Sequence, residues 1–429
     1  MISSNAERTA HFVFDGCDTV DLARIYGTPL YVMSETMIRS RLREIRESFL
    51  ERHPNTFAVY ASKAFQTLEI CKIVESEGIG LDVVSGGELY AAKRADFPMD
   101  RIFFHGNSKT PAELEMAVDF GVGRVVVDNL DELRILDGLA RSRGRRVPII
   151  FRLTPGVDSH THEYVSTGRL DSKFGIPLDP KVRDAYVGAA LAMKGVELKG
   201  FHFHVGSQIL VRDSHLKALE IVLGFMGEVK RDYGFEASDL NLGGGFGVHY
   251  TEQDAPEPIA HFTDAMVAAV DSGCSRLGLA RPRLIIEPGR WIVAEAGITL
   301  YTIGSVKEIP GIKTYVGVDG GMPDNPRPAL YGARYEALIA NKADAAPAGT
   351  YTIAGKCCET GDILIRDIAL PAPEAGDIVA VSTTGAYNHS MASNYNRLPR
   401  PAVVMTAAGR HRLSVRRESF EDLIARELG

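Results

Sequence analysis

The sequence predicts a (β/α)8 barrel, TIM-like, followed by a C-terminal all-β domain that the N-terminal segment completes. Eight short apolar runs alternate with segments of helical character over roughly 230 residues, which matches such a barrel in strand number and length. After Arg290 the pattern changes to short strands without long helices between them. A doubly wound open sheet is the structural alternative, but it usually has fewer strands.

The eight barrel strands are predicted from continuous apolar runs, because parallel strands are buried on both faces. The runs, each followed by the residue near which it ends, are TFAVYASK (Lys63), IGLDVVSGG (Ser85), RIFFHGN (His105), RVVVDN (Asp128), VPIIFRLTP (Arg152), LKGFHFHVGSQ (Ser207), LNLGGGFG (Gly245) and RLIIEPGR (Glu287). Helical segments such as LDELRILDGLARSRG lie between the runs, and several are closed by glycine.

The β domain is predicted from six later strand-like segments: ITLYTIGSVKEI, KTYVGVDGG, GTYTIAGKCCE, DILIRDIAL, DIVAVSTTG and PAVVMTAAG. HFVFDG and TPLYVMS precede the barrel and have the same character. We therefore predict an N-terminal segment over 1–35 that contributes to the β domain, a barrel over 36–287 and the β domain over 288–429.

Composition narrows the class of protein. The chain has 429 residues, 45% apolar and 24% charged, and a net charge of −7 without a basic stripe, so we expect neither a nucleic-acid nor a membrane partner. The start of the chain has neither a basic leader nor an apolar core segment, so we expect a cytoplasmic protein. Five cysteines without a C-x-x-C pair are expected to be reduced thiols rather than zinc ligands.

Polar residues gather at the predicted strand ends, where (β/α)8 barrels place their active sites. Lys63 closes the first strand; a lone lysine there is most often exposed, but a desolvated one can form a Schiff base. His202 and His204 follow the sixth strand, and a His-x-His pair also occurs in metal-dependent hydrolases. GGGFG (243–247) ends the seventh strand and would let backbone N–H groups approach a phosphate. EPGR places Glu287 and Arg290 on one turn, where a surface ion pair is the alternative.

Taken together, these residues are the parts that hold pyridoxal 5'-phosphate: an amine for a Schiff base, a flat imidazole, a glycine cradle and a buried carboxylate. The carboxylate favours one reaction over another. If Glu287 meets the pyridine nitrogen, that nitrogen stays protonated, and a protonated ring withdraws electrons from the substrate's Cα. This favours decarboxylation over racemisation.

An ordered series of motifs resembles the fold-type III, alanine-racemase-like pyridoxal-phosphate decarboxylases over nearly the whole chain. The motifs are YASKA, LDVVSGGEL, HEYVSTGRLDSKFGI, FHFHVGSQ, LNLGGGFG, EPGR, RPALYG, KCCETGD and GAYNHSMASNYNRLPRP. The resemblance implies that Lys63 carries the cofactor and that His204 stacks on its ring. The cofactor-binding residues that it implies are Lys63, Asp82, His204, Ser207, Gly244, Gly245, Glu287, Gly289, Arg290 and Tyr387.

The same resemblance implies a symmetric homodimer with active sites at the subunit interface. Cys358 and Glu359 would reach into the neighbouring subunit's site, with the Cys358 thiol as a proton donor. Lys63, His204 and Cys358 are then the expected catalytic residues. The expected substrate-binding residues are Arg290, Arg327, Tyr331, Glu359 and Tyr387. No metal is expected.

The substrate can be argued from charge. A decarboxylase of ornithine or lysine must hold a distal ammonium, whereas meso-2,6-diaminopimelate carries a second carboxylate that needs a cation. Arg327, with Tyr331 and Arg290, offers a guanidinium fork that suits a carboxylate and repels an amine, although a solvated loop arginine is the alternative. By resemblance, Glu359 would accept the distal amino group. We therefore expect decarboxylation of meso-2,6-diaminopimelate to L-lysine and CO2, the last step of lysine biosynthesis.

Three departures from the family pattern leave other interpretations open. The lysine motif reads YASKAF where the family often has an asparagine after the alanine, Lys356 stands in place of a usual proline, and GGMPDNPRPALYGARYEA is an unusual form of its loop. The same-fold alternative is a decarboxylase of ornithine, lysine, arginine or carboxynorspermidine. A non-catalytic pyridoxal-phosphate carrier and a metal-dependent barrel hydrolase that uses His202 and His204 are the alternatives from other classes.

Overall fold

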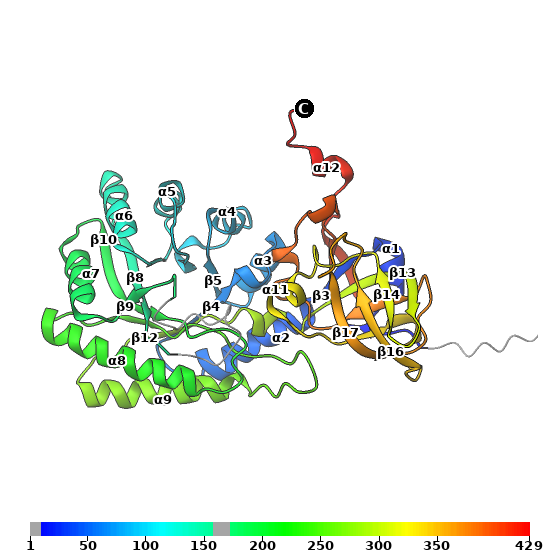
Figure 1. Ribbon diagram of the computed structural model, residues 1–429. Helices are drawn as coiled ribbons and strands as arrows, with labels where there is room; N and C mark the ends of the chain where they lie inside the picture. Colours follow the sequence, from blue (N-terminus) through cyan, green and yellow to red (C-terminus); the bar gives the residue numbers. More distant parts are fainter. Residues whose placement is uncertain (1–9, 158–171) are drawn as a thin grey trace, which may run out of the picture. The chain divides into compact units, whose positions relative to one another are not determined.

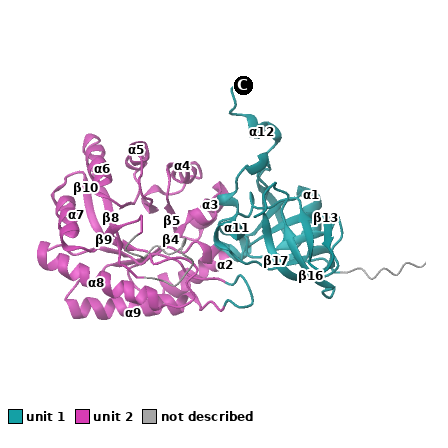
Figure 2. Ribbon diagram, viewed as in Figure 1, with its two compact units in different colours: residues 1–38, 249–254, 293–429 teal, residues 39–248, 255–292 magenta. Residues whose placement is uncertain are grey.

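The computed structural model describes residues 10–157 and 172–429 (Figure 1). The chain divides into two compact units (Figure 2). One contains the chain up to Ile38, His249–Asp254 and Val293–Gly429, and the other contains Arg39–Val248 and Ala255–Ile292. The domain boundaries predicted at residues 35 and 287 stay predictions. None of the helices in the described part of the chain combines the length and apolar character that a membrane crossing requires.

The second unit is the predicted parallel barrel. Its eight strands are β4 (Thr56–Ala61), β5 (Gly80–Val83), β6 (Ile102–Phe104), β7 (Arg124–Val127), β8 (Val147–Thr154), β10 (Val196–Phe203), β11 (Asp239–Asn241) and β12 (Arg283–Ile286). Each pairs in parallel with its neighbours, and pairing of β8 with β10 closes the circle. All eight predicted strands are therefore confirmed. A short strand that the sequence did not predict, β9 (Ile176–Pro177), pairs with the end of β8.

Helices precede, connect and follow the barrel strands and form the outer layer seen in Figure 1. They are α2 (Glu35–Ile45), continued by the π-helical turn η1 (Arg46–Leu50), α3 (Leu68–Ser76), α4 (Gly86–Arg94), α5 (Pro111–Phe120), α6 (Leu130–Ser142), α7 (Pro180–Ala192), α8 (Asp213–Tyr233), α9 (Ile259–Leu277) and the short α10 (Arg290–Val293). Their ends follow local chemistry. For α5, Thr110 and Glu113 form a capping box, and Gly121 ends the helix at φ 74°, a conformation that glycine adopts without strain.

Apolar side chains fill the barrel interior. Val59, Phe103, Val126, Ile150 and Ile285 come from five different strands and form one buried cluster. Because this layer excludes water from the middle of the barrel, polar side chains on the strands gather at the two ends.

The first unit is β-rich, as predicted, and residues from the start of the chain belong to its sheet. A nine-stranded sheet contains the path β17-β16-β14-β13-β3-β19-β20, with β18 pairing both β13 and β15. Its strands are β3 (Leu30–Ser34), β13 (Gly297–Ile309), β14 (Lys313–Val318), β15 (Ala337–Ile339), β16 (Gly349–Ala354), β17 (Ile363–Leu370), β18 (Ile378–Val381), β19 (Ala402–Ala407) and β20 (Arg410–Val415). The hairpin β1 (Val13–Phe14) and β2 (Cys17–Asp18) and the helices α1 (Thr19–Tyr26), α11 (Arg327–Tyr331) and α12 (Phe420–Ile424) complete it. β3 lies between β13 and β19, which explains why the N-terminal segment is needed to complete the β unit.

An ion network joins the amino-terminal ends of three barrel strands. Asp239, the first residue of β11, accepts from Arg124 of β7 at 2.7 Å and from Arg283 of β12 at 3.0 Å. The Asp239 side chain is 3% exposed, against 18% for Arg124 and 31% for Arg283. In this fold the amino-terminal end serves stability and the carboxyl end serves catalysis.

Replacing Asp239 with asparagine is expected to lower the free energy of unfolding by about 2 kcal/mol, because two partly buried arginines lose their counter-ion. The midpoint of urea unfolding followed by circular dichroism measures this change. Asp131→Asn is the matched control, since Asp131 pairs with Arg134 on an exposed surface and such pairs contribute little. Equal midpoints for the two variants would contradict a stabilising role of the network.

Candidate active site

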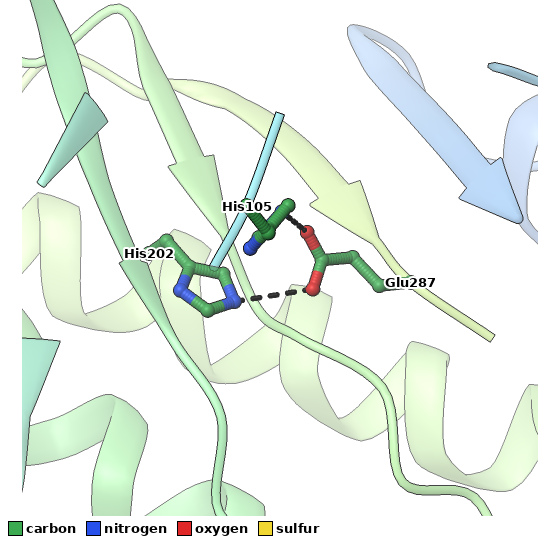
Figure 3. Close-up of side chains that lie close together, drawn as sticks. All are labelled: His105, His202 and Glu287. Carbon is green, nitrogen blue, oxygen red and sulfur yellow. Dashed lines mark hydrogen bonds and ion pairs between the residues drawn. The ribbon is translucent and has the colours of Figure 1, made fainter. Parts of the chain in front are cut away.

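A buried carboxylate, Glu287, lies at the carboxyl end of the barrel strands. Its Oε1 accepts a hydrogen bond from Asn241 Nδ2 at 2.6 Å and lies 2.6 Å from His105 Nε2. Its Oε2 lies 3.1 Å from His202 Nε2. Figure 3 shows the two imidazoles converging on the carboxylate. Since His105 follows β6, His202 lies in β10, Asn241 ends β11 and Glu287 follows β12, barrel closure assembles this cluster.

The surroundings fix the protonation of these groups. Burial works to raise the pKa of Glu287, but the charges and hydrogen bonds of His105 and His202 outweigh it and hold this pKa well below its usual range. Burial lowers the pKa of His202 to about 4, despite the nearby carboxylate. At neutral pH, Glu287 is therefore an ionised carboxylate, and His202 is a neutral imidazole that donates from Nε2.

Lys63 follows β4, and Asp82 lies in β5, the strand that pairs with β4. Lys63 occupies a single 3-10 turn, Ser62–Ala64, immediately after β4, and its side chain is exposed. Asp82 is buried in β5, with Oδ1 3.8 Å from His105 Nε2. Burial raises the pKa of Asp82, while the nearby positive charges of His105 and Lys63 act in the opposite direction. Lys63 is thus an accessible amine within electrostatic range of a buried acid.

The glycine run after β11 forms a backbone cradle. A Cβ on Gly244 would lie 2.1 Å from the Glu287 carbonyl oxygen, and one on Gly245 would lie 2.2 Å from the Gly206 carbonyl oxygen. Only glycine fits at these two positions, because the backbone there packs directly against the two carbonyl groups. Nearby, Arg290 donates to Ser207 Oγ from Nε at 3.3 Å and from Nη2 at 3.0 Å. Gly289 is also closely packed, since a Cβ there would lie 2.9 Å from Ala61 Cβ.

His204 follows β10 and is tied to this cradle. Its Nδ1 accepts from the Gly244 N–H at 3.2 Å, which leaves the proton on Nε2. Desolvation lowers the pKa of His204 well below its usual range, and the positive charges of Lys63 and Arg152 lower it further. The imidazole of His204 is therefore neutral at neutral pH.

Of the predicted substrate residues, Arg290 lies in the barrel unit and the others lie in the β-rich unit. Arg327 and Tyr331 are the first and last residues of α11; Arg327 is buried and Tyr331 is half-buried. Arg327 Nη1 donates to the hydroxyls of Tyr250 and Tyr335. Tyr387 is half-buried and has φ 62°, a left-handed conformation that costs energy in a residue other than glycine.

Cys358 and Glu359 are exposed on a turn held by Asp362. Asp362 is buried and accepts from the backbone N–H groups of Cys357 at 2.8 Å and Met322 at 2.7 Å. The two adjacent thiols differ. Burial and the Asp362 carboxylate raise the pKa of Cys357 to about 12, whereas Cys358 is exposed to solvent.

The barrel residues fit pyridoxal phosphate. The cradle has no room for a Cβ, and among the described residues neither Asp82 Oδ1 nor His202 Nδ1 has a hydrogen-bond partner, although both are buried. An accessible amine, a neutral flat ring, a phosphate cradle and an ionised carboxylate are all present. Ser207, Gly244, Gly245, Gly289 and Arg290 would hold the phosphate, and Glu287 would serve the ring nitrogen.

His105 and Asn241 are site residues that the sequence patterns did not identify. Both stand where a barrel strand ends, so the search for polar residues at strand ends could have found them if it had covered all eight strands. The group of possible metal ligands that the described residues bring together is His105, His202 and Glu287, rather than the pair His202 and His204. His204 instead accepts a hydrogen bond from the glycine cradle. Because β10 ends at Phe203, the alternation of side chains between the two faces of the strand no longer sets the direction of His204. Much of the motif HEYVSTGRLDSKFGI lies outside the described residues.

Comparisons with known proteins agree with this geometry. Residues 35–294 match the family model described as pyridoxal-dependent decarboxylase, pyridoxal binding domain. The chain is 46% identical to the diaminopimelate decarboxylase of Halalkalibacterium halodurans, covering 98% of this chain and 96% of that one. The enzyme of the same name from Bacillus subtilis is also 46% identical, with 99% and 97% covered.

A solved structure is similar throughout. The crystal structure of diaminopimelate decarboxylase from M. jannaschii has a TM-score of 0.91 and 35% identity, covering 98% of this chain and 96% of that one. The same M. jannaschii enzyme was also solved in complex with L-lysine. The chain belongs to the diaminopimelate decarboxylase family of pyridoxal-dependent decarboxylases.

Proposed function

We propose that this chain decarboxylates meso-2,6-diaminopimelate to L-lysine and CO2 with pyridoxal 5'-phosphate, the last step of lysine biosynthesis. The observation that carries the chemistry is the buried, ionised Glu287 beside an accessible Lys63 and a glycine cradle. The full-length similarity to diaminopimelate decarboxylases supports the substrate.

The barrel residues would hold and tune the cofactor. Lys63 Nζ would carry it, and Arg290 with Ser207 and the glycine backbone would bind its phosphate. Pyridoxal phosphate supplies an electron sink for the electron pair that remains when the substrate carboxylate leaves as CO2. Glu287 would keep a proton at the ring nitrogen, because its own protonation is disfavoured by its low pKa. The neutral His204 would stack on the cofactor ring and would leave the proton on the cofactor's ring nitrogen.

The β-unit residues would recognise the end of the substrate that does not react. Arg327 would bind the distal carboxylate, and Glu359 would accept the distal amino group. Tyr331 and Tyr387 of the same unit, with Arg290 of the barrel unit, would complete the set. A carboxylate–guanidinium pair forms two parallel hydrogen bonds, so it selects diaminopimelate over ornithine or lysine, whose distal group is a cation.

Cys358 would protonate the substrate carbon after CO2 leaves. We propose that Cys358 and Glu359 serve the partner subunit's site in a homodimer, so that each active site lies at the subunit interface. We also propose a cytoplasmic location, which suits a chain whose five cysteines are all free thiols.

The test of function is the absorbance spectrum of the purified protein, followed by addition of meso-diaminopimelate, L-ornithine and L-lysine in separate cuvettes while CO2 is monitored. We expect a yellow protein that releases CO2 with diaminopimelate alone. Release with another basic amino acid and none with diaminopimelate would keep the cofactor chemistry and overturn the substrate. A colourless protein that cannot be reconstituted would overturn the cofactor.

Glu287→Gln keeps the shape of the side chain and removes its charge. We expect kcat to fall by about 100-fold or more, because the ring nitrogen loses the anion that holds its proton. Titration of the bound cofactor's absorbance against pH should show that the ring nitrogen loses its proton at a lower pH than in the wild-type enzyme. Glu220→Gln, on an exposed position of α8, is the control. Unchanged kcat and an unchanged titration in Glu287→Gln would remove Glu287 from the proposed role.

Cys358→Ala tests the proton donor, and its neighbour supplies a matched control. We expect kcat to fall by about 100-fold with cofactor affinity unchanged, a typical effect of removing a general acid. Cys357→Ala should keep its activity, since that thiol is half-buried and has a pKa of about 12. Full turnover in Cys358→Ala would contradict the role.

A further inference from the structure

Arg327 is held by two tyrosines rather than by acids. Tyr250 Oη accepts from Arg327 Nη1 at 3.0 Å, and Tyr335 Oη accepts from the same nitrogen at 2.5 Å. The guanidinium carbon lies 5.1 Å from the ring centroid of Tyr250 and 5.7 Å from that of Tyr335. The two rings meet edge to face at 87°. All three side chains are buried, at 7% exposure or less.

This arrangement leaves one edge of the guanidinium available. Nη1 carries two hydrogens, and the two tyrosine oxygens account for both. Nε and Nη2, which form the opposite edge, donate no hydrogen bond to another described residue. That edge offers two parallel N–H groups, which is the geometry that a carboxylate accepts. No acidic side chain among the described residues forms a salt bridge with Arg327, so its charge is not neutralised internally.

A hydrogen bond links the segment that carries Tyr250 to the segment that carries Tyr335. Tyr335 follows α11 after the left-handed turn at Gly332, and this turn directs the chain back toward Arg327. Tyr250 lies in a segment that belongs to the same unit, where the Glu252 N–H donates to the Glu336 carboxylate at 2.8 Å. The residue next to Tyr335 therefore holds the segment that carries Tyr250. The ring contacts and this anchor restrict the guanidinium to one orientation before any ligand binds.

We propose that Tyr250 and Tyr335 are positioning residues that fix Arg327 so that its Nε–Nη2 edge receives the distal carboxylate of the substrate. This inference rests on the proposed function, because it assigns that carboxylate to Arg327. Pre-ordering a long side chain removes an entropy cost from binding, so the pair sets affinity for the carboxylate rather than the rate of the chemical step.

L-Lysine and cadaverine form a matched pair of probes, since cadaverine is L-lysine without its carboxylate. Competitive inhibition by each is measured against meso-diaminopimelate in the wild-type holoenzyme, Tyr335→Phe, Tyr250→Phe and the double variant. Phenylalanine keeps each ring and removes the hydroxyl alone. We expect the inhibition constant of L-lysine and the KM for diaminopimelate to rise about tenfold in each single variant, the effect of losing a hydrogen bond to a charged group. The constant for cadaverine, kcat and cofactor affinity should stay unchanged.

Tyr351→Phe, in β16 of the same unit, is the control and should change neither constant. Equal rises for L-lysine and cadaverine, or no rise for either, would overturn the positioning role. The single variants probe the same nitrogen independently, so a folding defect in one, detected as a lowered thermal midpoint, leaves the other as the test. A wild-type enzyme that does not turn over diaminopimelate would instead overturn the proposed function.

Discussion

The ionised Glu287 carboxylate is the constraint on which the barrel site depends. A buried charge is costly unless polar partners surround it. The hydrogen-bond donors of Glu287 lie in β10 and β11, His105 follows β6 and lies 2.6 Å away, and the carboxylate itself follows β12. No single strand or hairpin could supply that set. The barrel must close before the carboxylate is satisfied, so the fold and the electrostatics of the site are specified together. The closely packed backbone at Gly244 also links these strands, since it brings the glycine cradle after β11 against the Glu287 carbonyl group after β12.

Sequence pattern predicted those features whose signal is local. Each barrel strand is a continuous apolar run, so the eight strands and the residues that close them, such as Lys63 and Glu287, could be identified without knowing which strands are neighbours. Which of the strand-end residues contact Glu287 could not be identified in this way. His105 and Asn241 are separated from it by long stretches of chain, and it is the pairing order of the closed sheet that brings them close. The assignment of Tyr250 to the β-rich unit is equally non-local, because the residue lies in a loop between two barrel elements.

Charge balance around the site explains how neighbouring histidines reach the same protonation state with different partners. His202 is neutral because burial outweighs the nearby carboxylate, while His204 is neutral because burial and the charges of Lys63 and Arg152 act in the same direction. Hydrogen bonding then separates their functions. The Nε2–H of His202 is committed to Glu287, whereas His204 accepts a backbone N–H at Nδ1, which fixes its ring plane. Two imidazoles two residues apart thus bond a carboxylate and a backbone N–H respectively.

The division of the chain into two units also separates the two chemical tasks. The groups that fit the cofactor lie in the barrel, and the cation that fits a distal carboxylate lies on α11 with both of its tyrosine partners in the β-rich unit. Under the proposed function, a change of substrate would require new residues on α11 and in the segments that carry Tyr250 and Tyr335, while Glu287 and its partners could stay as they are. An arginine held by tyrosine hydroxyls rather than by a carboxylate is well suited to this purpose, since a carboxylate partner would have cancelled the charge that the substrate carboxylate needs. Under the proposed function, selectivity would thus depend on how the arginine is held as much as on its presence.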